Sequence, residues 1–357
     1  MSILESYGWN PSLQGLFSQR FHGSEKPGRV IVQQSAFEII SEEGPITCTL
    51  AGRLKYLAAG AEDLPVIGDW VGVEIASTGR KGRIVDILPR KTRFVRKAPG
   101  NRTVAQVLAA NVDLLFLISG LDEEFNLNRI ERYLVLARES GAVPIIVLNK
   151  TDMSGDVQSA ITLTGEAAPN VRLITMSART GEGFDELAGC LHPQETGALL
   201  GSSGVGKSSI LNLFLGSDRM KVQEVRTADG RGRHTTKHRE LILLPSGGML
   251  IDTPGMRELQ LWGEGRGVQD TFDDVEELAL QCKFSNCRHE TEPGCAVRTA
   301  VENQTLDAGR LESYQKLQRE LLHLKEKFDV RTRIQNKRAV KKISAAQRRW
   351  SKRKGLE

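Results

Sequence analysis

Residues 201–208 read G-S-S-G-V-G-K-S, a pattern whose residue types can bind the phosphates of a nucleotide. The glycines let the backbone turn so that N–H groups face phosphate oxygens, and the following helix start adds its positive dipole end. Lys207 is expected to reach the β- and γ-phosphates, and the Ser208 hydroxyl is expected to ligate Mg²⁺. A chance Gly/Ser-rich surface loop is the alternative, but the apolar stretches 197–200 and 209–215 favour a loop between a strand and a helix. The predicted phosphate-binding residues are Gly201, Ser202, Ser203, Gly204, Val205, Gly206, Lys207, Ser208 and Ser209.

A second motif, Asn149-Lys150-Thr151-Asp152, carries groups that can distinguish guanine from adenine. The Asp152 carboxylate can accept from the guanine ring N–H and exocyclic amine together, a donor pair that adenine lacks. Asn149 would face the acceptor edge of the base, and the aliphatic stem of Lys150 would lie over the ring. The motif follows an apolar run typical of a buried strand, and Ser177-Ala178 follows another. Because α/β sheets bind ligands at the carboxyl ends of strands, the predicted base-binding residues are Asn149, Lys150, Thr151, Asp152, Ser177 and Ala178.

Asp252-Thr253-Pro254-Gly255 follows a third apolar run and extends the phosphate side of the predicted site. Asp252 would hold Mg²⁺ through a water molecule, and the Gly255 N–H would contact the γ-phosphate. The next residue is Met256, close to where many GTPases place a glutamine that orients the attacking water. Another group must therefore orient the water, or the intrinsic hydrolysis rate is very low.

The loop G-R-G-R-H-T-T at 230–236 offers the remaining candidates. His234 is the nearest group that could orient water, and a contact to phosphate or to RNA is the alternative. Thr236 is predicted to ligate Mg²⁺, with Thr235 as the second choice. The predicted catalytic residues are Lys207, His234 and Thr236, and the predicted magnesium ligands are Ser208, Thr236 and Asp252.

The order of these motifs along the chain is unusual. In an ordinary GTPase the phosphate loop comes first and the base-reading motif comes late. Here the base-reading segments 149–152 and 177–179 precede the phosphate loop at 201–209, and 234–236 and 252–255 follow it. The sequence therefore predicts GTP hydrolysis by a circularly permuted α/β G domain.

Three of the five cysteines and one histidine fall within fourteen residues, spaced C-x4-C-x-H-x5-C. Thiolates and an imidazole at such spacing suit tetrahedral zinc, and four protein ligands leave no open position for a catalytic water. A disulfide framework is disfavoured because three cysteines leave one unpaired and no secretory signal is evident. The sequence predicts one structural zinc per chain, held by Cys282, Cys287, His289 and Cys295.

The sequence pattern of the N-terminal third is typical of a small β-barrel. Between residues 29 and 102, five short β-rich runs are separated by turn residues, which favours an OB-fold-like barrel. Barrels of this kind often bind RNA on one face, and a purely structural barrel is the alternative.

The charge is concentrated at the C-terminal end. The chain of 357 residues carries a net charge of +5, and residues 331–357 hold eleven Lys/Arg and one Glu. Such a segment can bind a polyanion by releasing its counterions, which favours nucleic-acid contact over a merely solvated end. An anionic membrane is the competing polyanion, but the apolar stripe of the segment is thin. No run approaches the ~18–20 apolar residues of a membrane span, so a cytoplasmic location is expected.

The chain resembles the ribosome small-subunit-dependent GTPase A family, bacterial assembly factors of the 30S subunit. The resemblance covers nearly the whole chain and rests on these residues: P-V-I-G-D-W-V at 65–71, L-N-R-I-E-R-Y-L at 127–134, G-R-H-T-T at 232–236 and E-P-G-C at 292–295. It implies a late maturation factor that binds the 30S subunit and its 16S rRNA near the decoding region. It also implies low GTPase activity that the subunit stimulates, and release of another maturation factor.

Three domains with terminal extensions are expected. Two other functions remain open: an RNA-binding module gated by nucleotide, in which hydrolysis is incidental, and a membrane-remodelling GTPase, which the thin apolar stripe disfavours. A monomer is expected. The predicted divisions are a leading segment 1–28, a β-barrel 29–102, a permuted G domain 103–265, a helical zinc-binding domain 266–330 and a basic tail 331–357.

Overall fold

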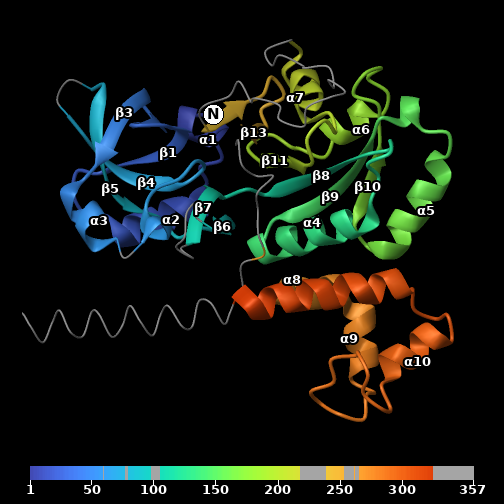
Figure 1. The fold of residues 1–357 in the computed structure, drawn as a ribbon. Coiled ribbons are helices and arrows are strands. Elements are labelled where there is room, and N and C mark those ends of the chain that lie inside the picture. The colour runs from blue at the N-terminus through green and yellow to red at the C-terminus, as the bar shows by residue number, and fades with distance from the viewer. Residues whose placement is uncertain are drawn as a thin grey trace, which may run out of the picture.

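Figure 1 shows the computed structural model of the chain, which describes residues 1–58, 60–76, 79–97, 105–217, 239–252, 261 and 265–324. The described elements form an N-terminal barrel, a central sheet with helices, and a C-terminal group of helices. Among the described helices, none combines the length and apolar character needed to cross a membrane.

The N-terminal barrel is closed by pairing between its first and fourth strands. Side chains alternate between the interior and solvent, as in β3, where Ile46 and Cys48 are buried and their neighbours are exposed. Val30, Ile39 and Ile84 complete the apolar interior. The predicted five-stranded barrel is confirmed, with strands β1 (Lys26–Gln33), β2 (Phe37–Ser41), β3 (Gly44–Leu50), β4 (Trp70–Ile75) and β5 (Lys81–Ile87), around which lie α1 (Ile3–Ser6), α2 (Pro11–Arg20), α3 (Gly52–Leu57) and η1 (Ala61–Asp63).

The central sheet has the order β10-β9-β8-β11-β13-β12, and all its strands except β12 are parallel. All seven residues of β8 are buried, as expected for a strand covered on both faces. β11, which leads into the phosphate loop, lies inside the sheet although it follows β10 in the chain. The strands are β8 (Leu114–Gly120), β9 (Val143–Asn149), β10 (Arg172–Thr175), β11 (Thr196–Gly201), β12 (Arg239–Leu243) and β13 (Met249–Asp252), and the helices are α4 (Leu127–Ser140), η2 (Thr151–Met153), α5 (Val157–Ala167), α6 (Phe184–Ala188) and α7 (Lys207–Leu215).

The barrel and the central sheet share one hydrogen-bonded surface. β1 pairs antiparallel with β12, with Val32 opposite Glu240, so that eleven strands form a continuous sheet. Arg29 is buried beside this seam and donates to the Tyr7 carbonyl at 2.5 Å and to the Thr196 hydroxyl at 2.8 Å. A separate hairpin of β6 (Arg93–Lys97) and β7 (Ala105–Ala110) spans the predicted boundary at residue 102.

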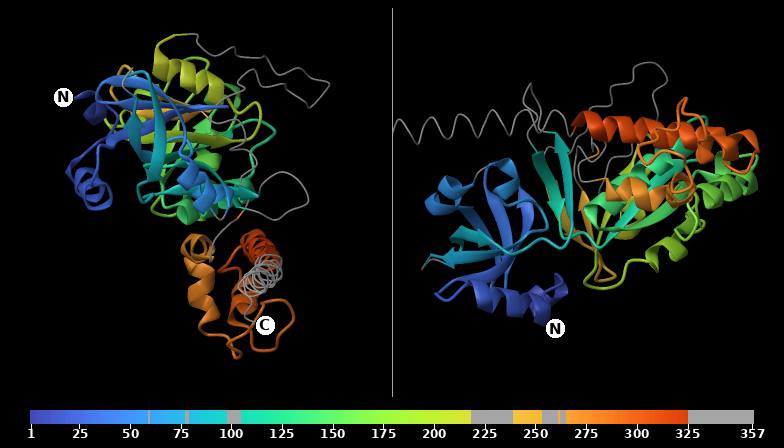
Figure 2. Two further views of the ribbon diagram at one scale, coloured as in Figure 1. Left: turned by 90° about the vertical axis from the view of Figure 1, so that its left-hand side faces the viewer. Right: turned by 90° about the horizontal axis from the view of Figure 1, so that it is seen from below.

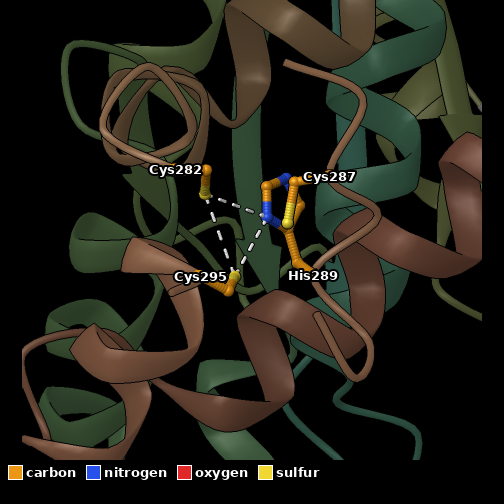
Figure 3. Close-up of side chains that lie close together, drawn as sticks. All are labelled: Cys282, Cys287, His289 and Cys295. Carbon is orange, nitrogen blue, oxygen red and sulfur yellow. Dashed lines mark hydrogen bonds between the residues drawn. The ribbon is translucent and has the colours of Figure 1, made fainter. Parts of the chain in front are cut away.

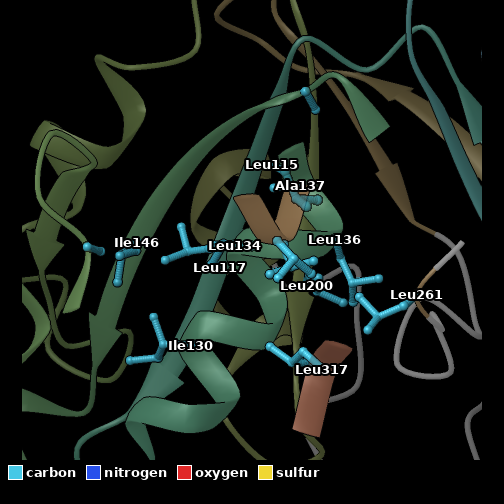
Figure 4. Packing of buried hydrophobic residues seen from close by; sticks show 14 of the residues in the cluster. Leu115, Leu117, Ile130, Leu134, Leu136, Ala137, Ile146, Leu200, Leu261 and Leu317 are labelled. Atoms are coloured by element: carbon cyan, nitrogen blue, oxygen red, sulfur yellow. The ribbon is translucent and has the colours of Figure 1, made fainter. Parts of the chain in front are cut away.

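The C-terminal helices lie beneath α4 (Figures 1 and 2), which separates them from the sheet. Leu317 of the C-terminal helix belongs to the same buried cluster as Ile130 and Leu134 of α4 and Leu115 of β8 (Figure 4). The apolar core is therefore continuous from the sheet into this region. Its helices are α8 (Arg266–Thr271), α9 (Asp273–Ala279), α10 (Ala296–Glu302) and the described helical residues 308–324.

Candidate functional site

The carboxyl ends of the parallel strands bring the predicted nucleotide-binding motifs to one edge of the sheet. β9 ends at Asn149, β10 at Thr175, β11 at Gly201 and β13 at Asp252. The N-K-T-D motif, the S-A pair, the phosphate loop and Asp252 therefore lie along a single edge, as the predicted strand ends require.

Asn149 joins three of these motifs through its buried side chain. Its amide nitrogen donates to the carbonyl of Val205 in the phosphate loop at 2.7 Å. Its amide oxygen accepts from the backbone N–H of Ala178 at 2.8 Å. Gly206 has a φ of +100°, and a Cβ there would lie 2.3 Å from the Asn149 amide nitrogen, so only glycine fits. The predicted base-reading and phosphate-binding segments are thus fixed relative to one another.

Asp152 and Lys150 are each held by a neighbouring polar group. The Ser177 hydroxyl donates to the Asp152 carboxylate at 2.6 Å, which orients that carboxylate beside Ala178. The Lys150 ammonium pairs with Asp122 at 2.5 Å. Burial alone would raise the pKa of the Asp122 carboxyl, but the hydrogen bond and charge of Lys150 hold that pKa below its ordinary value. A fixed lysine stem is suited to lying over a purine ring.

The phosphate loop has the backbone that its glycines predict. Gly204 has a φ of +79°, and Gly206 immediately precedes α7, whose first turn carries Lys207 and Ser208. The Lys207 ammonium donates to the Gly201 carbonyl at 2.8 Å and also to the Ser202 carbonyl. The start of α7 and the loop N–H groups make this edge suited to an anion.

Three polar residues near these motifs were not predicted as site residues. Asp122 holds Lys150, and both Arg129 and Glu124 contact the Ser202 side chain of the phosphate loop. A signal existed for Asp122 and Glu124, because both follow the buried strand β8, whose end lies at the same edge. Arg129 lies in the stretch 127–134 that carries part of the family resemblance, but its helical position alone does not indicate a contact with the phosphate loop.

The predicted switch residues lie outside the part of the chain that the structure describes. His234, Thr235, Thr236, Thr253 and Gly255 belong to this group. Their assignments to catalysis, magnesium and the γ-phosphate remain predictions.

The four predicted metal ligands converge in the C-terminal region (Figure 3). Their ligand atoms all lie within 4.8 Å of one another. The Cys282 and Cys295 sulfurs are 3.9 Å apart, and the His289 Nδ1 lies 3.6 Å and 3.4 Å from them. Tetrahedral zinc with ordinary bond lengths separates two sulfurs by about 3.8 Å and a sulfur from a nitrogen by about 3.5 Å. The cluster therefore has the dimensions to hold one metal ion.

The surrounding structure supports the shape of this cluster. His289 is buried and has a φ of +61°, which turns its ring toward the cysteines, and burial lowers the pKa of its imidazole. A neutral imidazole can offer a lone pair to a metal. Cys295 accepts from the backbone N–H of Arg298 at 3.4 Å, and Gln315 donates to the His289 carbonyl at 2.8 Å. The helix 308–324 therefore contacts the metal-binding loop directly.

Two ion pairs join this metal-binding region to α4. Arg310 contacts the buried Glu131 at 2.9 Å and makes two hydrogen bonds to Asp274 at 2.6 and 2.8 Å. Burial lowers the pKa of Arg310, but both carboxylates outweigh that effect and hold its pKa above the ordinary value. Arg132 makes a bidentate pair with Glu320 at 2.5 and 2.9 Å. Both contacts reach residues of α4, the helix that follows β8.

The sequence of the chain is similar to those of known proteins. A family model described as RsgA GTPase matches residues 87–262, and one described as 50S ribosome-binding GTPase matches residues 196–335. The chain is 44% identical to the small ribosomal subunit biogenesis GTPase RsgA of Opitutus terrae over 91% of this chain and 92% of that protein. It is 40% identical to the protein of the same name from Syntrophotalea carbinolica over 99% of each chain.

Two solved structures are similar to the chain. The crystal structure of YjeQ from Thermotoga maritima is 29% identical, with a TM-score of 0.63 over 84% of this chain and 99% of that one. The structure of YloQ, a circularly permuted GTPase, is 25% identical, with a TM-score of 0.59 over 87% of this chain and 97% of that one. The predicted circular permutation is confirmed by these likenesses and by the position of β11 in the sheet.

Proposed function

The chain belongs to the RsgA family of small ribosomal subunit biogenesis GTPases, and on this basis we propose that it binds the 30S subunit late in assembly and hydrolyses GTP when the subunit stimulates it. The protein is a GTP hydrolase that acts in small-subunit biogenesis. The two hydrogen bonds of the Asn149 side chain, one to the phosphate loop and one to Ala178, carry the assignment of the nucleotide site, because they link the predicted base-reading and phosphate-binding segments.

The guanine base would be read by Asp152, whose carboxylate can accept from the ring N–H and the exocyclic amine together. Ser177 orients that carboxylate, and the Ala178 N–H, which donates to the Asn149 amide oxygen in this structure, would turn to the guanine carbonyl when the base binds. Asn149 and Thr151 complete this side, and the stem of Lys150 would cover the ring. Adenine offers an acceptor where Asp152 needs a donor, so the site would exclude ATP.

The phosphates would bind to the N–H groups of residues 201–209, with Lys207 on the β- and γ-phosphates. A magnesium ion would neutralise the charge that develops on the phosphates during transfer. Oxygen donors suit this ion, and the described residues that would hold it are Ser208, at the start of α7, and Asp252, at the end of β13. We assign Thr236 as its third protein contact, Gly255 to the γ-phosphate and His234 to the attacking water.

The metal in the C-terminal cluster would be zinc with a structural role. Cys282, Cys287, His289 and Cys295 would fill a tetrahedral shell, and the donor set of three sulfurs and one nitrogen is typical of structural zinc. Such an ion would hold the loop between α9 and α10 in the shape that Gln315 contacts.

Contact with the 30S subunit would be made through 16S rRNA, in the cytoplasm, by a monomer. The barrel is of a kind that binds RNA on one face, and residues 331–357 bring eleven Lys/Arg for phosphate contacts. The relatives' printed name, small ribosomal subunit biogenesis GTPase, supports the small subunit as the partner. Release of another maturation factor follows from the same resemblance, and the domain divisions at residues 28, 102, 265 and 330 stay predictions.

GTP turnover with and without purified 30S subunits tests this function. We expect slow turnover by the protein alone and a clear increase when subunits are added, because subunit contact would contribute to positioning the attacking water. Purified 50S subunits serve as the control for nonspecific RNA. An unchanged rate with 30S subunits would favour a nucleotide-gated RNA-binding module, and stimulation by liposomes would favour a membrane-acting GTPase.

Replacement of Asp152 by Asn tests the base assignment. The amide keeps one acceptor but places a donor against the guanine amine, so preference should shift from GTP toward XTP by at least roughly tenfold. Competition binding with GTP, XTP and ATP measures this shift. Asp156→Asn, an exposed change at the start of α5, is the matched control and should leave the preference unaltered. An unchanged GTP preference in Asp152→Asn would remove that residue from the base site.

A further inference from the structure

The first turn of α4 contacts the phosphate loop through a closed network of hydrogen bonds. Arg129 donates to the Ser202 hydroxyl at 3.1 Å, and that hydroxyl lies 3.2 Å from a Glu124 carboxylate oxygen. Arg129 and Glu124 also pair at 3.3 Å. A serine hydroxyl can accept from the arginine while it donates to the carboxylate, so all three contacts are compatible at once.

Ser202 is held from two sides by this arrangement. Its carbonyl accepts from the Lys207 ammonium, the group that would contact the β- and γ-phosphates, while its side chain is held by Arg129 and Glu124. A shift of Arg129 would therefore move the segment of the phosphate loop whose carbonyl the Lys207 ammonium contacts. Misplacement of reacting groups by about 1 Å can cost up to 100-fold in rate, so such a small shift matters to hydrolysis.

Within one turn of Arg129, residues of the same helix α4 also contact the metal-binding region. Glu131 contacts Arg310, and Arg132 contacts Glu320 in helix 308–324. Arg129 and Arg132 are three residues apart, which places them about 4.5 Å apart along the helix axis. The Asn126 side chain caps α4 by accepting from the Arg129 N–H at 3.1 Å. This cap stabilises the first helical turn, which carries Arg129.

We propose that Arg129 is a positioning residue for GTP hydrolysis, which acts through Ser202 and carries displacements of the helix 308–324 to the phosphate loop. The proposal rests on the proposed function, in which the 30S subunit stimulates hydrolysis. Contact of the subunit with the metal-binding region would shift the helix 308–324, and the ion pairs to Glu131 and Arg132 would pass this shift along α4. The contacts that Arg129 and Glu124 make with Ser202 would then switch between two arrangements, and this switch would pass the shift to the phosphate loop.

A double-mutant cycle of Arg129→Ala and Ser202→Ala tests the proposal. Each single change removes the same charge-assisted hydrogen bond, so each should lower kcat about tenfold while KM for GTP changes much less. If Arg129 acts through Ser202, the double variant should be no slower than either single variant. Arg129→Lys should recover part of the rate because an ammonium can still donate to the hydroxyl. Arg172→Ala, which breaks an exposed Arg–Glu pair on β10 of the same sheet, is the matched control and should leave kcat unchanged.

The stimulation by 30S subunits separates this role from a merely structural one. The ratio of kcat with and without subunits should fall toward one in Arg129→Ala and stay at the wild-type value in Arg172→Ala. Should Arg129→Ala fold poorly, Ser202→Ala supplies the same measurement, since it removes only a hydroxyl from a loop. Additive losses in the double variant, or a wild-type stimulation ratio in both single variants, would overturn the proposal. An unstimulated wild-type protein would instead contradict the proposed function.

Discussion

Removing the metal from the C-terminal cluster should unfold the segment 275–300 and abolish binding to 30S subunits, with little effect on GTP affinity. Three thiols and an imidazole lie within 4.8 Å of one another, and we expect metal binding to supply most of the folding free energy of this loop, beyond the hydrogen bonds that Gln315 and Glu292 make to it. Apparent binding free energies of structural zinc in small modules are about 10–16 kcal/mol, as large as the whole stability of an ordinary domain, about 5–15 kcal/mol. Metal analysis should give one zinc per chain, and hydrogen exchange should show lost protection confined to this segment.

Cys295→Ser tests the same prediction without a chelator, since it removes one buried ligand. Cys190→Ser is its matched control, because Cys190 is also buried but lies outside the cluster beside α6. The control should retain zinc and 30S binding. Equal loss of GTP binding and 30S binding on metal removal would contradict a role limited to the C-terminal region.

Replacement of Lys207 by Ala should abolish tight binding of GTP while the fold survives. The ammonium would make charge-assisted contacts to two phosphates, and their loss should cost a few kcal/mol, roughly 100-fold or more in affinity. Calorimetric titration with a non-hydrolysable GTP analogue measures this change. Lys91→Ala removes an exposed lysine that pairs with Asp113 and should bind the analogue normally. Wild-type affinity in Lys207→Ala would exclude residues 201–209 as the phosphate site.

The convergence of the predicted nucleotide-binding motifs was predictable because its signals are local. Each motif follows a short apolar run, and the carboxyl ends of parallel strands meet at one edge, so sequence order alone brought Asn149, Gly201 and Asp252 together. The metal cluster was predictable for a similar reason, because cysteine and histidine at close spacing have few alternatives. The barrel followed from five short β-rich runs separated by turn residues, and β3 shows the alternation of buried and exposed side chains that such a barrel requires.

The contacts that join the barrel, the central sheet and the C-terminal helices were not predictable, because each involves residues far apart in the chain. Nothing near Arg29 indicates that it will be buried beside Thr196, and nothing near Arg310 indicates a partner at Glu131. The packing of the leading segment was not predictable for the same reason. Its Trp9 and Phe17 have a place only because Trp70 of the barrel offers an apolar surface to pack against.

The seam between β1 and β12 has a consequence for the order of folding during synthesis. Gln33 and Arg239, which meet across this seam, are 206 positions apart, so roughly 10–40 s of elongation separates them. The barrel needs only residues up to β5 to close, and β8, β9 and β10 can pair before the phosphate loop leaves the ribosome. β11 must then join the free edge of β8, and the β12–β13 hairpin must fill the remaining gap between β11 and β1. A nascent chain therefore acquires its base-reading edge first, and the described strands that flank the phosphates are complete only after residue 252 has been made.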